Sequence, residues 1–185
     1  IVPAPSGAIE TGQRAWFELF ERAAVMEAIT KQQAWRVLTA EGESHGIHSH
    51  AELFPESPEP ARWRYARSNG VALHVTWADA CARAYRELVE RDRVLGAWYG
   101  DLRPRRIDLD LGAAGLDRSS SYEWRAYSFD DDEPSALHVA GVFGFPASAT
   151  APLVYGFSAA GDAQHALTDA AREATQLLAF LWGEP

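Results

Sequence analysis

The spacing of apolar residues along the chain predicts three helices. Helical periodicity covers residues 13–40 and 76–97, and a third helix is expected to begin after 161–162. Thr76 is the expected N-cap of the second helix, because Asp79 follows three residues later, as in a capping box. The helices are therefore well separated along the chain, with room for strands between them.

Alternating and β-branched stretches predict strands, most of them in the second half of the chain. These stretches are 106–111, 122–129, 136–145 and 152–160. The segment 62–75 is expected to form two short strands, or a strand and a turn around 68–70. The segments rich in proline, glycine and polar residues are expected to be loops, and they are 1–12, 41–61 and the solvated turn "DDDE" at 130–133. The pattern predicts an α+β fold, with a mixed or antiparallel sheet and helices packed on one face.

Composition narrows the class of protein. The chain has 185 residues, of which 47% are hydrophobic and 23% charged, as in a soluble globular domain. The formal net charge of −9 argues against a nucleic-acid binder with a broad basic surface, although a local basic patch such as "RPRR" at 103–106 is compatible with it. No apolar run is long enough to span a membrane. The single cysteine, Cys81, fits a cytoplasmic setting.

One motif occurs on all three predicted helices: an acidic residue followed three positions later by another side chain with an oxygen. The three copies are Glu18, Glu21 and Arg22 in "FELFER", Glu87, Glu90 and Arg91 in "RELVER", and Glu173 and Gln176 in "REATQ". At this spacing both side chains project from one face of a helix, about one turn apart. A single such pair is compatible with a solvated helix face. Its recurrence on three helices points to a shared site.

The residues between the paired carboxylates are mostly apolar, so the carboxylates are expected to be half-buried and to need a counter-ion. Mg²⁺ is a suitable counter-ion, because it is commonly bound through carboxylates and substrate phosphates. Arg22 and Arg91 would then be placed to meet phosphate oxygens. The chain has neither a P-loop nor a G-x-G-x-x-G motif. The motifs therefore predict a nucleotide site of another kind.

Three blocks of the sequence resemble the YcaO family. "RSNGVALHVTWADACARAYRELVERDRVLGAWY" (67–99) is similar to the central block of the family, in which a Ser-x-Gly turn leads into a helix that ends Glu-x-x-Glu-Arg-Asp. "YGFSAAGDAQHALTDAAREATQ" (155–176) is similar to the later block, and "RAWFELFER" (14–22) to the first helix. The blocks occur in the order of the family and span most of the chain. The chain begins without methionine, so we expect a single YcaO-like domain over 1–185, as a truncated or minimal version of a longer chain.

The resemblance implies a fold that binds ATP and Mg²⁺ between helix carboxylates. The implied metal ligands are Glu18, Glu21, Glu87, Glu90 and Glu173, and the implied nucleotide contacts are Ser68, Arg22, Arg91 and Gln176. The implied activity is ATP-dependent phosphorylation of a peptide backbone amide, leading to a thiazoline or oxazoline in a ribosomally made peptide. The implied partners are a precursor peptide and a leader-peptide-binding protein, and a homodimer is compatible with the resemblance.

The sequence departs from the family pattern at two positions near the motifs. Arg14 stands where the family often has serine, and His74 stands where it often has glycine. A second hypothesis is therefore a non-catalytic YcaO-like subunit that scaffolds a peptide-modifying complex. An unrelated α+β interaction domain is a third. The cluster His45, His48 and His50 allows for a transition-metal site, with a solvated loop as the alternative.

Overall fold

The computed structural model describes residues 6–31, 33–53, 69–116, 121–131 and 136–183. The chain divides into two compact units, an N-terminal unit of residues 1–85 and a C-terminal unit of residues 86–185. The division falls inside the long helix α3 (Trp77–Tyr99), so each unit holds part of this helix. The expectation of one domain over 1–185 stays a prediction.

The N-terminal unit contains a long helix and a small hairpin. Its elements are α1 (Ser6–Thr30), β1 (Trp35–Leu38), β2 (Ser44–His48), α2 (His50–Leu53) and the first part of α3. The strands β1 and β2 pair antiparallel. The helix predicted over 13–40 is therefore wrong at both ends, and the loop predicted over 41–61 contains a strand and a short helix within its described part.

Local chemistry explains these differences. Pro3 and Pro5 precede α1, and proline is compatible with the start of a helix although it breaks the interior. After residue 34 the sequence Trp-Arg-Val-Leu is aromatic and β-branched, which favours a strand over continued helix. Gly42 has a φ of +86°, a conformation that glycine adopts without strain, and it allows the chain to reverse between the two strands.

The C-terminal unit is built on a four-stranded antiparallel sheet with the strand order β3-β4-β5-β6. Its elements are β3 (Arg105–Ile107), β4 (Tyr122–Ser128), β5 (His138–Pro146), β6 (Val154–Ala160) and α4 (Ala163–Gly183), together with the second half of α3. The predicted α+β class, the last three strands and the second and third helices are confirmed. Thr76 caps α3 as expected, because its Oγ1 accepts a hydrogen bond from the backbone N–H of Asp79.

One predicted strand is shorter than expected, and another prediction lies partly outside the described residues. The strand expected over 106–111 ends at Ile107, because Asp110 Oδ1 accepts hydrogen bonds from the backbone N–H groups of Gly112 and Ala113 and so forms a turn. In the range 62–75, residues 62–68 lie outside the described part of the chain. Residues 69–75 form a turn and an irregular segment, in which Gly70 has a φ of +72°.

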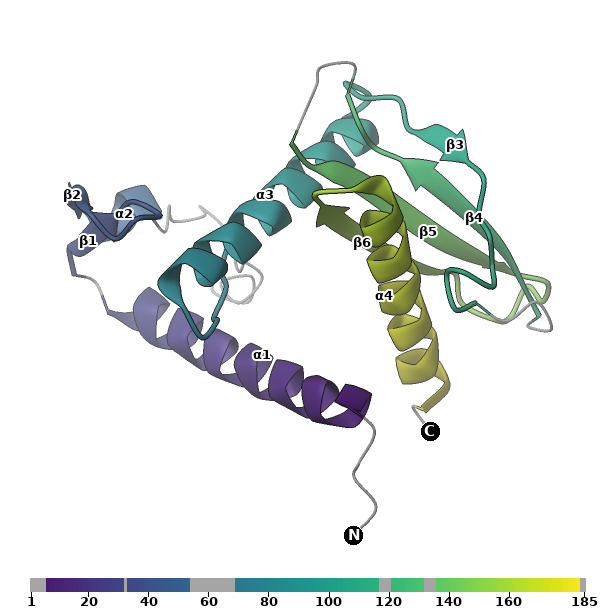
Figure 1. Cartoon of the computed structure of the whole chain (residues 1–185), viewed down its shortest axis with the longest axis horizontal. Helices are drawn as coiled ribbons and strands as arrows, with labels where there is room; N and C mark the ends of the chain where they lie inside the picture. Colours follow the sequence, from purple (N-terminus) through teal and green to yellow (C-terminus); the bar gives the residue numbers. More distant parts are fainter. Residues whose placement is uncertain (1–5, 32, 54–68, 117–120, 132–135, 184–185) are drawn as a thin grey trace, which may run out of the picture. The chain divides into compact units, whose positions relative to one another are not determined.

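Helices cover both faces of this sheet rather than the one face expected (Figure 1). On one face α4 buries a row of mostly small residues against the strands. On the other face the second half of α3 packs over the aromatic side chains of Tyr127, Phe129, Phe143 and Phe157. The α4 residues are Ala166, Leu167, Ala170, Ala171 and Ala174. The strand β5 is buried along most of its length, which is typical of a strand with both faces covered.

The close approach of α4 to the sheet depends on Gly156 of β6. A Cβ added at this glycine would lie 2.3 Å from the carbonyl oxygen of Ala170 and 2.5 Å from the backbone nitrogen of Ala174. No side chain fits in that space. The glycine and the facing alanines therefore fix α4 against β6 at short range.

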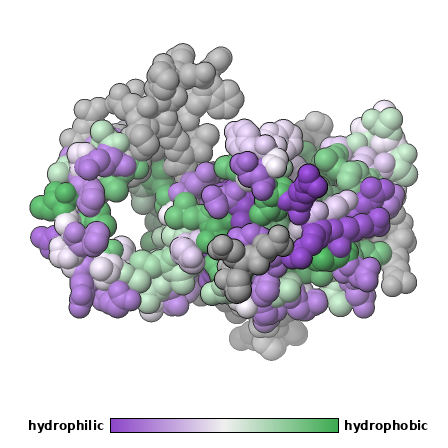
Figure 2. Space-filling model, turned by 90° about the horizontal axis from the view of Figure 1, so that it is seen from above, coloured by the Kyte–Doolittle hydropathy of each residue, from purple (hydrophilic) through white to green (hydrophobic). Residues whose placement is uncertain are grey.

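Large hydrophobic side chains also reach the surface. Figure 2 shows hydrophobic groups interspersed with hydrophilic ones on the face in view. In the second half of α3 the exposed examples are Leu88, Leu95, Trp98 and Tyr99, with Trp98 83% exposed. In the part of the chain that the structure describes, no helix is long and apolar enough to span a bilayer.

Candidate functional site

The second acidic motif lies on α3, where the helix enters the C-terminal unit. Glu87 is partly buried and the side chain of Glu90 is only 13% exposed. The Nη1 of the adjacent Arg91 lies 3.8 Å from Glu90 Oε1, beyond hydrogen-bond distance. The Nε of Arg91 is buried and has no hydrogen-bond partner among the described residues. This segment therefore holds a weakly compensated carboxylate and a guanidinium nitrogen with unused hydrogen-bonding capacity.

The electrostatic environment of Glu90 is unusual for a glutamate. Burial raises the pKa of Glu90 to about 7, Arg91 opposes this rise, and the nearby charges of Glu173 and Glu87 add to it. A carboxyl group with such a pKa is about half ionised at neutral pH. Three carboxylates thus lie close enough together for their charges to repel.

The third motif reaches the same region from α4. Glu173 Oε2 accepts a hydrogen bond of 2.8 Å from the backbone N–H of Phe157 in β6. This contact is possible because Gly156, the preceding residue, lets α4 lie directly against the strand. Gln176 lies about one turn further along α4 and is exposed.

The geometry explains how residues far apart in sequence converge. In the described part of the sheet β6 is an edge strand, with α3 packed on one face and α4 on the other. Glu173 reaches the outer edge of β6, and its charge contributes to the raised pKa of Glu90 on α3. The second and third motifs therefore meet beside the edge of β6.

The first motif lies on α1 in the N-terminal unit. Glu18 and Arg22 are exposed, and Glu21 is partly buried. Glu21 Oε2 accepts a hydrogen bond of 3.3 Å from the backbone N–H of Leu73, in the segment that follows the turn at 69–70. The structure thus links the first helix to the segment that follows the Ser-x-Gly turn.

The two departures from the family pattern lie in this unit. The imidazole of His74 stacks on Phe17 of α1 with ring centroids 6.0 Å apart, and its Nδ1 lies 3.4 Å from Asp79 Oδ2. Arg14 lies on α1. Ser68, the expected nucleotide contact, is outside the described residues. His74 therefore contacts Phe17 of α1 and Asp79 of α3, with its side chain 38% exposed.

The described residues contain no group of three His, Cys, Asp or Glu side chains that is already arranged to hold a metal ion. This applies to Glu87, Glu90 and Glu173, and also to the histidine cluster 45–50. In that cluster His48 Nδ1 lies 3.8 Å from Glu52 Oε1, and Glu52 accepts hydrogen bonds from Ser49. The transition-metal hypothesis thus gains no support from the described part of the chain.

The chemistry of the residues beside β6 nevertheless fits Mg²⁺ and a nucleotide. Mg²⁺ prefers oxygen ligands and is commonly held by one or two carboxylates plus phosphate oxygens, so a complete protein cage is not required. A cation would relieve the repulsion around Glu90. The unpartnered Nε of Arg91 would match a phosphate oxygen.

One buried network was missed by the sequence-based predictions. Asp130, expected in a solvated turn, accepts hydrogen bonds from Arg93 Nη1, His138 Nδ1 and the N–H of Val139, at 3.2, 2.9 and 2.8 Å. Arg93 is itself buried, with 7% exposure. Buried arginine needs a partner, but the run of acidic residues at 130–133 does not reveal which of them turns inward.

Comparison with known proteins places this geometry in a family. Residues 47–183 match the family described as YcaO cyclodehydratase, ATP- and Mg²⁺-binding. Among curated proteins, none matches the chain by sequence.

Several solved structures share the fold. A heterocyclase in complex with substrate and cofactor is 24% identical, with a TM-score of 0.56 over 76% of this chain and 19% of its own. The YcaO protein of Methanopyrus kandleri, bound with AMPPCP and Mg²⁺, is 18% identical, with a TM-score of 0.59 over 80% of this chain and 40% of its own. The Escherichia coli microcin synthetase McbBCD with pro-MccB17 bound is 15% identical, with a TM-score of 0.58 over 81% and 40%.

The chain spans about a fifth of the heterocyclase and two fifths of the other two proteins. The family description names ATP and Mg²⁺, which confirms the expected cofactors at the level of the family. The match covers most of the chain and includes the second and third motifs. On this evidence the chain belongs to the YcaO family.

Proposed function

We propose that this chain provides the nucleotide-binding part of a cyclodehydratase that activates peptide backbone amides with ATP and Mg²⁺. The product would be an azoline, a thiazoline or oxazoline, in a ribosomally made peptide. The observation that supports this most directly is the convergence of Glu87, Glu90 and Glu173 beside β6, with the pKa of Glu90 raised to about 7. Repulsion among these carboxylates destabilises the fold when no cation is bound. A functional role would explain why the protein contains such a cluster.

Each motif residue has a proposed role. Glu87, Glu90 and Glu173 would hold magnesium in the C-terminal unit, and Glu18 and Glu21 would supply the ligands from α1. The nucleotide contacts are proposed to be Arg22, Arg91, Ser68 and Gln176.

The bound nucleotide and metal would supply a phosphoryl group that makes the amide oxygen a good leaving group. The chain would hold the peptide amide and neutralise charge on the transferring group through Arg91. A Cys, Ser or Thr side chain of the peptide would add to the amide carbon. Loss of phosphate, which takes the former amide oxygen with it, would leave the ring.

The alternative is a non-catalytic YcaO-like subunit that scaffolds a peptide-modifying complex. The observation that favours it is the packing of His74 on Phe17, where the family often has glycine. The exposed Trp98 and Tyr99 on α3 also suit a surface that packs on further protein. In either case we propose a cytoplasmic protein that works with a precursor peptide and a leader-peptide-binding partner.

Turnover with a peptide pool separates the two functions. The protein is incubated with ATP, Mg²⁺ and peptides that contain Cys, Ser or Thr, with and without candidate leader-binding partners. We predict peptide-stimulated phosphate release, accompanied by loss of one water from the modified peptide in mass spectra. ATP binding without either signal, when partners are present, would favour the scaffold instead.

A further inference from the structure

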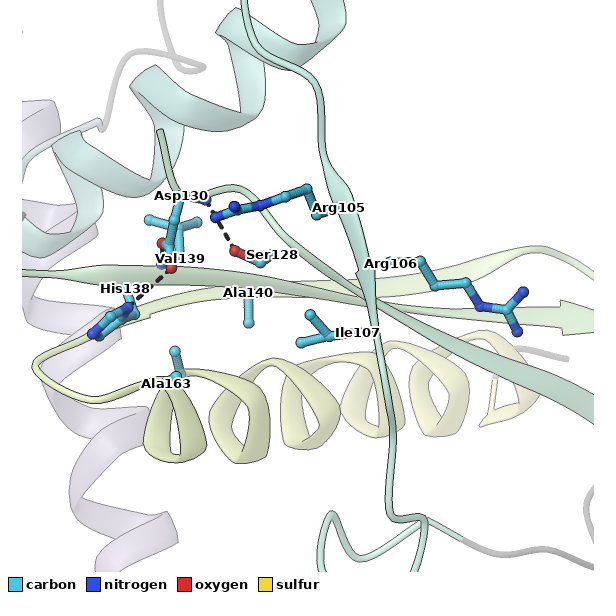
Figure 3. Close-up of a pocket in the computed structure, with 10 residues that line it drawn as sticks. Arg105, Arg106, Ile107, Ser128, Asp130, His138, Val139, Ala140 and Ala163 are labelled. Carbon is cyan, nitrogen blue, oxygen red and sulfur yellow. Dashed lines mark hydrogen bonds and ion pairs between the residues drawn. The ribbon is translucent and has the colours of Figure 1, made fainter. Parts of the chain in front are cut away.

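A cavity lies in the C-terminal unit, beside the edge strand β3. It has a volume of about 400 Å³ and is formed by β3, the adjoining ends of β4 and β5, and the first turns of α4 (Figure 3). The nucleotide proposal does not use it. Its apolar floor includes Ile107, Ala140 and Ala163. Its polar lining residues are Arg105, Arg106, Ser128, Asp130 and His138.

The charge of Asp130 is already compensated within the protein. Its Oδ1 accepts hydrogen bonds from Arg93 and from the N–H of Val139, and its Oδ2 accepts one from His138 Nδ1. Partial burial alone would raise the pKa of Asp130, but the bonds from His138 and Val139 outweigh burial and hold the pKa below its ordinary value. Asp130 therefore stays ionised and has little capacity left to attract a cation.

Two groups that can receive an anion remain. Asp130 accepts a hydrogen bond from the Nδ1–H of His138, so the Nε2 on the other side of the ring can donate to a carboxylate when the imidazole is protonated. Arg105 pairs with Ser128 in the strand register, and Figure 3 shows its side chain extending toward Ser128 and Asp130. Among the described residues the side chain of Arg105 makes no hydrogen bond or ion pair. Arg106, next along β3, also lines the cavity, but Figure 3 shows its side chain directed away from Ser128 and Asp130.

The floor limits the size and polarity of the ligand. Ala140 and Ala163 are small, and Ile107 is partly buried against the same core as α4. Such a floor accommodates a short methylene stem and offers few polar partners. A carboxylate on an aliphatic stem matches both the floor and the guanidinium of Arg105 at the rim.

The position of β3 favours a peptide as the source of that carboxylate. In the described part of the chain β3 is the edge of the sheet, so one side of its backbone is open to an added strand. An extended segment laid beside β3 would place a side chain next to the cavity.

We propose that this cavity binds the carboxylate of a glutamate or aspartate side chain in an extended peptide, through Arg105 and His138. The further claim that this peptide is the substrate to be modified rests on the proposed function. The carboxylate site itself does not, and it can be tested without ATP or Mg²⁺. Its failure is therefore distinguishable from failure of the nucleotide site.

The probe is N-acetyl-glutamate N-methylamide, which carries one carboxylate and no free termini. The readout is the imidazole nitrogen resonance of His138 in protein labelled at histidine, assigned with His138→Gln. We predict saturable shifts with a dissociation constant in the millimolar range, as expected for one exposed charge pair. Arg105→Gln should weaken binding at least fivefold, and the matched control Arg103→Gln, an exposed arginine that does not line the cavity, should not change it.

Two further ligands make the test decisive. The isosteric glutamine analogue should produce no saturable shift, and inorganic phosphate should bind more weakly than the glutamate probe. Equal binding of the glutamine analogue, equal or tighter binding of phosphate, or unchanged binding by Arg105→Gln would each overturn the inference.

Discussion

At the scale of single residues, Glu90 is the most informative side chain. It combines low exposure, a neighbouring arginine beyond hydrogen-bond distance and two nearby carboxylates. The sequence shows that Glu87 and Glu90 share a helix face, but not that Glu90 is buried. Its burial depends on how α3 packs over the sheet, and its pKa depends in part on Glu173, which is far away along the chain. Tertiary structure therefore sets the chemistry of this residue.

Substituting Glu90→Gln is predicted to stabilise the protein without ligands at high pH. The pKa of Glu90 is raised in the folded state, so its stabilising contribution is complete below the unfolded pKa near 4.5 and is lost as pH rises through about 7. Glutamine avoids this loss. We expect a gain in the free energy of unfolding of about 1–3 kcal/mol at pH 8 and less than about 1 kcal/mol at pH 5.

Urea unfolding at the two pH values measures this difference. Asp92→Asn, an exposed site on the same helix, is the matched control and should change stability little at either pH. Equal effects of Glu90→Gln at pH 5 and pH 8 would show that the Glu90 carboxylate is not strained in the unliganded fold.

At the scale of elements, most regular structure follows from local patterns, and the exceptions have local causes. Thr76 caps α3 where the sequence predicts it, and the apolar alternation in 122–129 gives β4. The predicted strand after β3 fails because the Asp110 side chain competes for the backbone N–H groups that a ladder would use. The burial of both sheet faces could not be predicted, because it depends on which helices return to the sheet.

The contact between β6 and α4 gives a second stability prediction. Gly156→Ala would place a methyl group 2.3 Å from the Ala170 carbonyl oxygen, so the helix must move away from the strand. We expect a loss of about 2–4 kcal/mol in the free energy of unfolding. The displacement should also weaken the hydrogen bond between Glu173 and Phe157.

Gly161→Ala is the matched control, because nothing lies within 4 Å of the position of its added Cβ. Thermal unfolding of the two variants provides the comparison. If both variants unfold at the temperature of the wild-type protein, the close approach of α4 does not stabilise the unit as inferred.

At the scale of the whole molecule, the ordered set of motifs predicts more than any single motif does. The family and the fold class follow from the three blocks together, and both are confirmed. The site is predicted less completely. The structure brings Glu87, Glu90 and Glu173 together, whereas Glu18 and Glu21 lie in the other compact unit and Ser68 lies outside the described residues.

Calorimetric titration of the chain with ATP in the presence of Mg²⁺ tests the central claim most directly. We predict saturable binding that requires Mg²⁺ and that weakens at least tenfold in the double variant Glu87→Gln/Glu90→Gln, because the metal loses two charged ligands. Asp101→Asn, an exposed carboxylate elsewhere, should bind as the wild-type protein does. Absence of binding by correctly folded wild-type protein, or unchanged binding by the folded double variant, would contradict the proposed site.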